Sequence, residues 1–339
     1  MRRRVLAARA DSMGDVLVTG PALRALAAEA DVVLLCGPRG YEAARLLPGI
    51  AGVVCAELPW IDPEPKPVDP AAMTSLINSF ASMHADEAVI FTSFHQSALP
   101  LALLMRMAGV RRISAISDDY PGSLLDVRHR DPGDVHEVER ALSLARAAGF
   151  SLPADDDASL RIGSVGEPPA AVAALAPYVV VHPGASVPAR MWPVERFAAL
   201  VRRLRASRVR VVVTGGHGEE RLTQFVARGQ ALDLGGRLTL RELAATIASA
   251  EVAVVPNTGP AHLAAAVSTP IVSLFAPVVS AARWRPWRVP HVLLGDQQAE
   301  CAGTRARVCP VPGHPCLASV TVDDVLRATE SLIGVRQAA

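Results

Sequence analysis

The chain has 339 residues, more than a single hydrophobic core usually serves, so its length predicts two domains. Hydrophobic residues make up 50% of the chain and charged residues 20%, a balance that indicates a folded globular protein and not a disordered one. The formal net charge is only +1, so the sequence gives no sign of the basic face that a nucleic-acid partner requires.

The start of the chain is basic, but its apolar run is broken by Arg9 and Asp11, too early for the core of a signal peptide. No later segment reaches the roughly 18 uninterrupted apolar residues that span a bilayer. We therefore expect a cytoplasmic protein without a transmembrane segment, for which peripheral membrane contact stays open.

In the first half of the chain, apolar runs alternate with helical stretches, a pattern typical of a parallel sheet with helices on both faces. A proline-dense segment at 58–70 predicts a surface loop. Expected strands are 5–8, 32–36, 53–56, 87–91 and 112–115, and expected helices are 21–30, 70–83, 97–107 and 135–148.

An acidic segment with glycine and proline at 151–169 predicts the interdomain linker. The alternation then restarts, with expected strands 178–182, 210–214, 232–234, 251–255 and 270–275 and expected helices 194–206, 219–228, 240–249, 259–266 and 322–333. The predicted fold is α/β, with two doubly wound, Rossmann-like domains at 1–160 and 170–320 facing a central cleft. The final segment, 321–339, is expected to cross back to the first domain as a helix.

The first strand is followed by a turn that contains Gly14 and Asp15. Ligands in open α/β sheets bind beyond the carboxyl ends of strands, so this turn is a candidate site. It lacks the GxGxxG pattern, which disfavours a dinucleotide site. Asp15 has an ordinary alternative role as an acid near a helix N-terminus.

Three turns of small residues in the second half are candidate nucleotide-binding sites. The first, at 182–186, is followed by Arg190, which could pair with a diphosphate or be an exposed cation. The second, at 214–220, ends in two acids that could bind ribose hydroxyls or favour the start of a helix. The third, at 256–263, places Thr258 and Gly259 at a helix N-terminus and His262 one turn in, where a core histidine is the alternative.

Cys301, Cys309 and Cys316 lie close together in sequence with His314. Three thiolates and one imidazole could form a tetrahedral zinc site, although no CxxC pair is present. The alternatives are a loop of reduced thiols and a labile disulfide.

Five segments in order carry a resemblance to a known family: SMGDVLVTGPALRAL, VHPGASVPARMWPVERFAAL, TGGHGEE, LTLRELAATIASAEVAVVPNTGPAHLAAA and TPIVSLFAP. They resemble glycosyltransferase family 9, the family of ADP-heptose-dependent heptosyltransferases. The likeness runs from about residue 4 to about residue 333. It implies a GT-B fold, transfer with inversion at the anomeric carbon, no catalytic metal and no cofactor besides the nucleotide-sugar donor.

The resemblance also implies roles for individual residues. It places the general base at Asp15 and the sugar or acceptor side at Ser12, Met13 and Gly14. It assigns to the donor nucleotide the residues Gly184, Ala185, Ser186, Arg190, Glu219, Glu220, Leu238, Asn257, Thr258, Gly259 and His262. Arg190 and His262, with the Thr258 and Gly259 N–H groups, would stabilise the leaving diphosphate.

Two positions depart from the family's pattern. Heptosyltransferases commonly have lysine where this chain has Arg190, and aspartate where it has Asn257, which can donate as well as accept hydrogen bonds. A nucleotide-sugar epimerase or hydrolase, a non-catalytic sugar-nucleotide binding protein and an oxidoreductase are the competing functions. The acceptor, a glycan or small saccharide, is expected at loops around Trp60, His95, 118–120 and 128–130.

Overall fold

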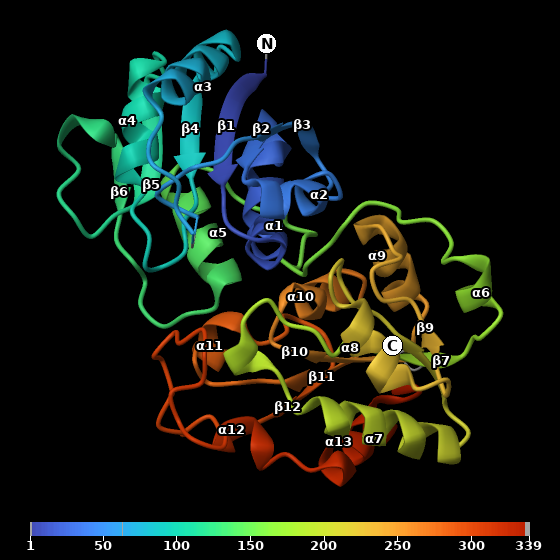
Figure 1. Cartoon of the computed structure of the whole chain (residues 1–339). Helices are drawn as coiled ribbons and strands as arrows, with labels where there is room; N and C mark the ends of the chain where they lie inside the picture. The colour runs from blue at the N-terminus through green and yellow to red at the C-terminus, as the bar shows by residue number, and fades with distance from the viewer. Residues whose placement is uncertain (1, 63, 336–339) are drawn as a thin grey trace. The chain divides into compact units, whose positions relative to one another are not determined.

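The computed structural model describes residues 2–62 and 64–335. The chain forms two compact units, Met1–Gly163 and Ser164–Ala339, each built around its own sheet (Figure 1). The boundary between them falls inside the segment 151–169. In the described parts of the chain, no helix is long and apolar enough to cross a membrane.

The first unit contains a parallel sheet of six strands in the order β3-β2-β1-β4-β5-β6. The strands are β1 (Arg3–Arg9), β2 (Ala30–Cys36), β3 (Ile50–Cys55), β4 (Glu87–Ile90), β5 (Arg112–Ile116) and β6 (Val127–His129). The order reverses direction between β1 and β4, so the carboxyl ends of these two strands border the crevice where such sheets bind ligands.

Helices cover both faces of this sheet because successive strand residues point to opposite sides. Leu6 and Ala8 of β1 pack in a cluster with α3 and α4, whereas α1 packs against α5. The helices are α1 (Met13–Glu29), η1 (Pro38–Gly40), α2 (Tyr41–Ala44), α3 (Pro70–Ser82), α4 (Leu99–Met107), η2 (Gly122–Leu124) and α5 (Glu137–Ala147).

The second unit repeats the same topology in a parallel sheet of order β12-β11-β10-β7-β8-β9. Its strands are β7 (Tyr178–Val181), β8 (Arg210–Val213), β9 (Leu232–Asp233), β10 (Val252–Pro256), β11 (Ile271–Leu274) and β12 (His291–Leu294). The order reverses between β7 and β10. Its helices are α6 (Ala170–Ala173), η3 (Pro188–Arg190), α7 (Val194–Ala206), α8 (Glu220–Ala227), α9 (Leu240–Ala248), α10 (Gly259–Ala266), α11 (Ala281–Trp284), α12 (Pro315–Ala318) and α13 (Val322–Leu332).

The α/β class with two doubly wound parallel sheets is as predicted, but several elements differ. The first helix begins at Met13, eight residues before the expected start at Pro21, which lies inside the helix. Strands β6 and β12 were not predicted. Both are short, half-buried edge strands, so neither has the continuous apolar run that marks a buried strand.

The expected C-terminal helix is present as α13, Val322–Leu332, and its crossing to the first unit stays a prediction. Helix α13 packs against α7 and against strands β10, β11 and β12 of its own unit. Its apolar face, with Val325, Leu326, Ala328 and Leu332, belongs to the core of the second unit. Residues 336–339 of the predicted segment lie outside the described residues.

Candidate active site

Asp15 lies in the first turn of α1, directly after the carboxyl end of β1. The backbone N–H of Ser12 donates to Asp15 Oδ2 at 3.0 Å, and the Ser12 hydroxyl donates to the same oxygen at 2.5 Å. The carboxylate therefore completes a capping box, so the helix-cap role that the sequence left open is present. Met13 and Gly14 form the helical residues between these two side chains.

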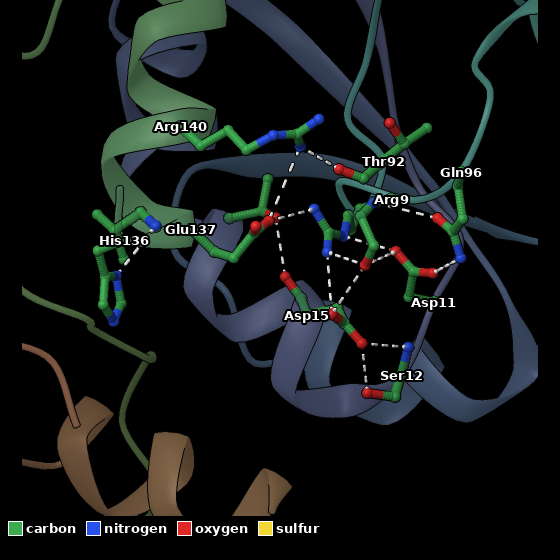
Figure 2. Close-up of polar contacts among 12 residues, drawn as sticks. Arg9, Asp11, Ser12, Asp15, Thr92, Gln96, His136, Glu137 and Arg140 are labelled. Atoms are coloured by element: carbon green, nitrogen blue, oxygen red, sulfur yellow. Dashed lines mark hydrogen bonds and ion pairs between the residues drawn. The ribbon is translucent and has the colours of Figure 1, made fainter. Parts of the chain in front are cut away.

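A buried guanidinium holds this carboxylate from the other side (Figure 2). Arg9, the last residue of β1, is only 1% exposed. Its Nη2 lies 2.9 Å from Asp15 Oδ1, and its Nε lies 2.8 Å from Asp11 Oδ2. Nη1 of the same side chain is 3.8 Å from Glu137 Oε2 on α5. One cation thus faces three carboxylates.

A second layer of polar groups surrounds Arg9 and was not predicted from the sequence. Arg140 is paired with Glu137 at 3.8 Å and with Asp131 at 3.3 Å, and it donates to the carbonyl of Thr92. Gln96, after β4, donates its side-chain N–H to Asp11 (Figure 2). The only sequence signals were the charges directly after apolar runs, which do not identify partners far along the chain.

The two aspartates beside Arg9 differ in their proton affinity. Burial acts to raise the pKa of Asp15, but the Arg9 charge and the hydrogen bonds from Ser12 outweigh it, so the pKa of Asp15 is lower than usual. At Asp11 burial outweighs the attraction of Arg9, and the neighbouring Asp15 charge adds to it, so the pKa of Asp11 is raised. Asp15 is therefore ionised at neutral pH, as a base must be, and Asp11 is the first of the pair to take up a proton.

In the second unit, the turn after β7 approaches the turn after β8. A Cβ added at Gly184 would lie 2.1 Å from Glu219 Oε1, so only glycine fits beside the present position of this carboxylate. Glu219 Oε2 accepts from the Gly216 N–H at 2.7 Å and lies 3.9 Å from His182 Nε2. Glu220, beside it, accepts from the Gly218 N–H at 2.9 Å. Both acids thus order the glycine turn and favour the start of α8.

The turn after β10 contacts the loop that follows β7. Arg190 donates through Nη1 to the backbone carbonyl of Asn257 at 3.3 Å. The Asn257 side chain donates to the Ala276 carbonyl and accepts from the Ala276 N–H, both at 3.4 Å. An aspartate at this position could accept hydrogen bonds but could not donate one to the Ala276 carbonyl. The structure thus explains why asparagine suits this position.

Thr258 occupies the N-cap position of α10, and its backbone N–H donates to the Pro256 carbonyl at 2.9 Å. That N–H is thus engaged in the turn and not directed to an anion as expected. His262, one turn into α10, is 5% exposed, with its ring centroid 6.1 Å from that of Trp284. Of the remaining predicted donor residues, Ala185 and Leu238 are half-buried and Ser186 is exposed.

The cysteine-rich loop does not form the four-ligand zinc site considered from its spacing. His314 places its Nε2 atom 3.1 Å from the Ala189 carbonyl. Within the described ranges, no group of three or more histidine, cysteine or acidic side chains is arranged to hold a metal. Cys301, Cys309 and Cys316 are free thiols, and burial, with the adjacent Cys301, raises the pKa of Cys316 to about 12.

The fold and the sequence agree with known glycosyltransferases. The structure of ADP-heptose lps heptosyltransferase II from E. coli matches 99% of this chain and 100% of its own, with a TM-score of 0.74 at 18% identity. A glycosyl transferase of family 9 from Veillonella parvula DSM 2008 matches 97% of both chains, with a TM-score of 0.77 at 16% identity. The fold is therefore the α/β GT-B fold.

Sequence similarity to a curated relative is more local. Lipopolysaccharide heptosyltransferase 3 from Escherichia coli is 35% identical over 116 residues, which are 32% of this chain and 34% of that protein. The match thus spans about a third of the relative's length. The family model for glycosyltransferase family 9 (heptosyltransferase) matches residues 82–314, which is more than half of the chain. The chain belongs to glycosyltransferase family 9, the heptosyltransferase family.

Proposed function

We propose that this protein transfers a sugar, a heptose from ADP-heptose, to an acceptor hydroxyl in one inverting displacement without a catalytic metal. The observation that carries this proposal is the ionised Asp15 carboxylate at the carboxyl edge of β1, with 15% of its side chain exposed. Membership of family 9 supports the reaction class. The ADP-heptose named for the similar E. coli enzyme supports the donor.

In the proposed step, the acceptor oxygen forms a bond to the anomeric carbon while the bond from that carbon to the diphosphate breaks. Asp15 takes the acceptor proton, and the leaving diphosphate keeps the bonding electron pair. General base catalysis of this kind contributes roughly 10²–10⁴ in rate. Arg9 keeps the carboxylate ionised and, together with Ser12, fixes its position.

The second unit would bind the donor. Because the residues at 184–186 are small, the backbone N–H groups of this turn could approach a diphosphate, as in other phosphate-binding turns. Arg190, the N–H of Gly259 and His262 would stabilise the leaving group, without the Thr258 N–H that bonds Pro256. Glu219 or Glu220 would accept hydrogen bonds from the ribose. Thermal shifts with ADP, GDP, UDP and dTDP test this part, and a preference for another nucleotide would contradict the ADP-heptose assignment.

Replacement of the base is the decisive experiment. Asp15→Ala is expected to lower the transfer rate by at least about 100-fold and to leave the affinity for ADP within about twofold. Transfer is measured as the appearance of glycosylated acceptor, and affinity by calorimetry with ADP. Donor consumption without acceptor would instead indicate the epimerase or hydrolase alternative.

A matched control separates catalysis from helix capping. Asp324 completes a similar capping box at α13, where Thr321 donates to it through its N–H at 2.9 Å and its hydroxyl at 2.6 Å. Asp324→Ala removes an equivalent cap, worth about 1 kcal/mol, and is expected to leave transfer unchanged. Loss of ADP affinity in Asp15→Ala would assign this carboxylate to donor binding, and unchanged transfer would place the base elsewhere.

A further inference from the structure

A buried guanidinium at the carboxyl end of β1 is shared by two aspartates (Figure 2). Arg9 is 1% exposed, and its Nε atom lies 2.8 Å from Asp11 Oδ2 while its Nη2 atom lies 2.9 Å from Asp15 Oδ1. Such interactions are screened in water but strengthened by burial. How strongly Arg9 attracts negative charge at Asp15 therefore depends on the charge state of Asp11.

A hydroxyl group is shared by the same two carboxylates. Ser93, in the turn after β4, is 4% exposed, and its Oγ atom accepts a hydrogen bond from Arg9 Nη2 at 3.0 Å. The same Oγ atom lies 3.4 Å from Asp11 Oδ2 and 3.4 Å from Asp15 Oδ1. A hydroxyl has one proton, so Ser93 donates to one carboxylate at a time. Both distances exceed the usual O–H···O length of about 2.7 Å, so the donor is fixed to neither.

The other charged groups around Arg9 leave this competition in place. Glu137 on α5 lies 3.8 Å from Arg9 Nη1, and it pairs at the same distance with Arg140. Arg140 is in turn paired with Asp131 at 3.3 Å. These contacts leave the Nε and Nη2 groups of Arg9 to the two aspartates. We call Arg9, Asp11, Asp15, Ser93 and Glu137 the Arg9 network.

Asp11 is the member of the aspartate pair that is protonated first as the pH falls. Burial raises its pKa against the attraction of Arg9, and the negative charge of Asp15 adds to the rise. Gln96 donates its side-chain N–H to Asp11, and Arg39 in η1 adds a smaller attraction, yet the pKa of Asp11 stays above its usual value. The pKa of Asp15 is lowered. Between the two titrations, a neutral Asp11 thus lies beside an ionised Asp15.

Neutralisation of Asp11 changes both shared groups. A neutral Asp11 attracts the Arg9 guanidinium less, so Asp15 interacts with more of its charge. The new O–H group of Asp11 can donate to Ser93 Oγ, which leaves the Ser93 proton to Asp15. Each stronger donor lowers the affinity of a carboxylate for a proton. A carboxylate with lower proton affinity is a weaker general base, so it removes the acceptor proton more slowly.

We propose that Asp11 is a positioning residue for transfer: its negative charge draws one guanidinium and one hydroxyl away from Asp15, and its protonation directs both to Asp15 and slows the reaction. The two donors are Arg9 and Ser93. The inference rests on the proposed function, in which Asp15 is the base. Transfer should therefore decline as the pH falls through the titration of Asp11, above the ordinary aspartate value of about 3.9, while Asp15 is still ionised.

Comparison of Asp11→Asn with the unchanged protein over a range of pH tests this role. Asparagine has the shape of a protonated aspartate, so the variant imitates the neutral state at every pH. We expect the unchanged protein to transfer about 10-fold faster at about pH 7.5 and the two rates to converge where Asp11 is protonated. Transfer is measured with ADP-heptose and the acceptor used for Asp15→Ala. A ratio of rates that is constant with pH would overturn the proposal, because a merely structural role does not titrate.

Asp156→Asn is the matched control. Asp156 is a buried aspartate of the same unit, with 9% of its side chain exposed, and it pairs with Arg24 Nε at 2.6 Å. The substitution removes an equivalent buried ion pair outside the Arg9 network. It should lower the melting temperature and leave the pH dependence of transfer unchanged. If Asp156→Asn shows the same convergence of rates at low pH, the effect does not come from Asp11.

Ser93→Ala tests the hydroxyl and keeps every charge of the Arg9 network, so it also serves if Asp11→Asn does not fold. The decline of transfer at low pH should become smaller, because no hydroxyl proton is redirected to Asp15. The control is Thr19→Val, since the Thr19 hydroxyl is buried and donates to the Asp15 backbone carbonyl at 2.8 Å. It should leave the decline unchanged. An equal decline in Ser93→Ala and the unchanged protein would exclude the proposed role of Ser93.

A titration without turnover separates this inference from the proposed function. Carbon-13 NMR of the aspartate carboxyl groups should show Asp11 titrating at a higher pH than Asp15, and the reverse order would overturn the proposal. If Asp15→Ala retains transfer, the assignment of the base is wrong and the role of Asp11 in transfer fails with it. If Asp15→Ala loses transfer while the ratio for Asp11→Asn is constant with pH, the base is correct and the role of Asp11 is wrong.

Discussion

The two sheets have the same strand order, but different kinds of side chain lie where that order reverses. We call the carboxyl edge between β1 and β4 the first crevice and the carboxyl edge between β7 and β10 the second crevice. At the reversal between β1 and β4, side chains with opposite charges are buried around Arg9. At the reversal between β7 and β10, glycines and backbone groups predominate, as with Gly184 against Glu219 and Asn257 against Ala276. Topology thus determines where a ligand binds, whereas the residues after each strand determine what chemistry is possible there.

The difference matches the division of labour that we propose. A proton acceptor needs a carboxylate whose ionisation and orientation are controlled, which buried charges provide. A diphosphate needs open space beside backbone N–H groups, which small residues provide. Substitutions in the two crevices should therefore have effects of different kinds and sizes.

The largest effect is expected when the central cation of the first crevice is removed. Arg9→Met leaves Asp11, Asp15 and Glu137 facing one another without Arg9, which should lower the free energy of unfolding by about 3–5 kcal/mol at neutral pH. The loss should shrink as the pH falls and the carboxylates become protonated. Urea denaturation at several pH values measures both effects.

Arg45→Met is the control, because Arg45 is an exposed cation, with 58% of its side chain accessible, that pairs with Glu42 at 3.7 Å on the surface. Removal of the Arg45 charge should lower the free energy of unfolding by at most about 1 kcal/mol. A similar small cost for Arg9→Met would mean that the Arg9 network does not organise the first crevice by charge.

A smaller, steric effect is expected in the second crevice. Gly184→Ala should lower the free energy of unfolding by about 1–2 kcal/mol, because the new methyl group displaces the Glu219 carboxylate from the Gly216 N–H. In a Glu219→Ala background the same substitution should cost much less, since the carboxylate is absent. Thermal denaturation of the single and double variants measures the coupling between these residues.

Gly52→Ala serves as the comparison for the steric argument. A Cβ at Gly52 would meet only a Val33 methyl group, at the ordinary distance of 3.9 Å. If Gly184→Ala is equally costly with and without the Glu219 side chain, the close approach is not what requires glycine at this turn.

The smallest effect is a pH dependence in the second crevice. Burial lowers the pKa of His182, although the negative charge of Glu219 acts to raise it. The unfolded chain therefore binds more protons than the folded one below the ordinary pKa of about 6.5, and stability should fall as the pH drops through this range, by at most about 1.4 kcal/mol per pH unit. His182→Gln should remove this component from the pH profile of urea denaturation.

His217→Gln provides the control, because the His217 side chain is 98% exposed in the neighbouring turn. It should leave the pH dependence of stability unchanged. An equal effect of the two substitutions would show that burial of His182 is not the cause.

Sequence patterns predicted the fold well where elements are long and buried. The helix start at Met13 was missed because a proline usually marks the first turn of a helix, yet Pro21 lies inside α1. The existence of α13 was predicted, since its amphipathic pattern shows which face is buried, although such a pattern does not identify the partner that covers it.

The candidate site was predicted only in part. The turns that bear Asp15, Gly184 and Thr258 follow strands and were recognised by that position. The Arg9 network could not be predicted, because Arg9 bonds Ser93 at a separation of 84 residues, and such pairs form only when the sheet brings β1 and β4 together.

The capping box at Asp15 links the proposed proton transfer to the stability of the first turn of α1. The oxygens that would receive the acceptor proton belong to the carboxylate that tethers the Ser12 N–H and hydroxyl at the head of α1. Protonation weakens a carboxylate as a hydrogen-bond acceptor. We therefore expect the hydrogen bonds from Ser12 to weaken while Asp15 holds the acceptor proton and to strengthen again when the proton leaves. Local fraying of the first turn of α1 would then accompany each turnover.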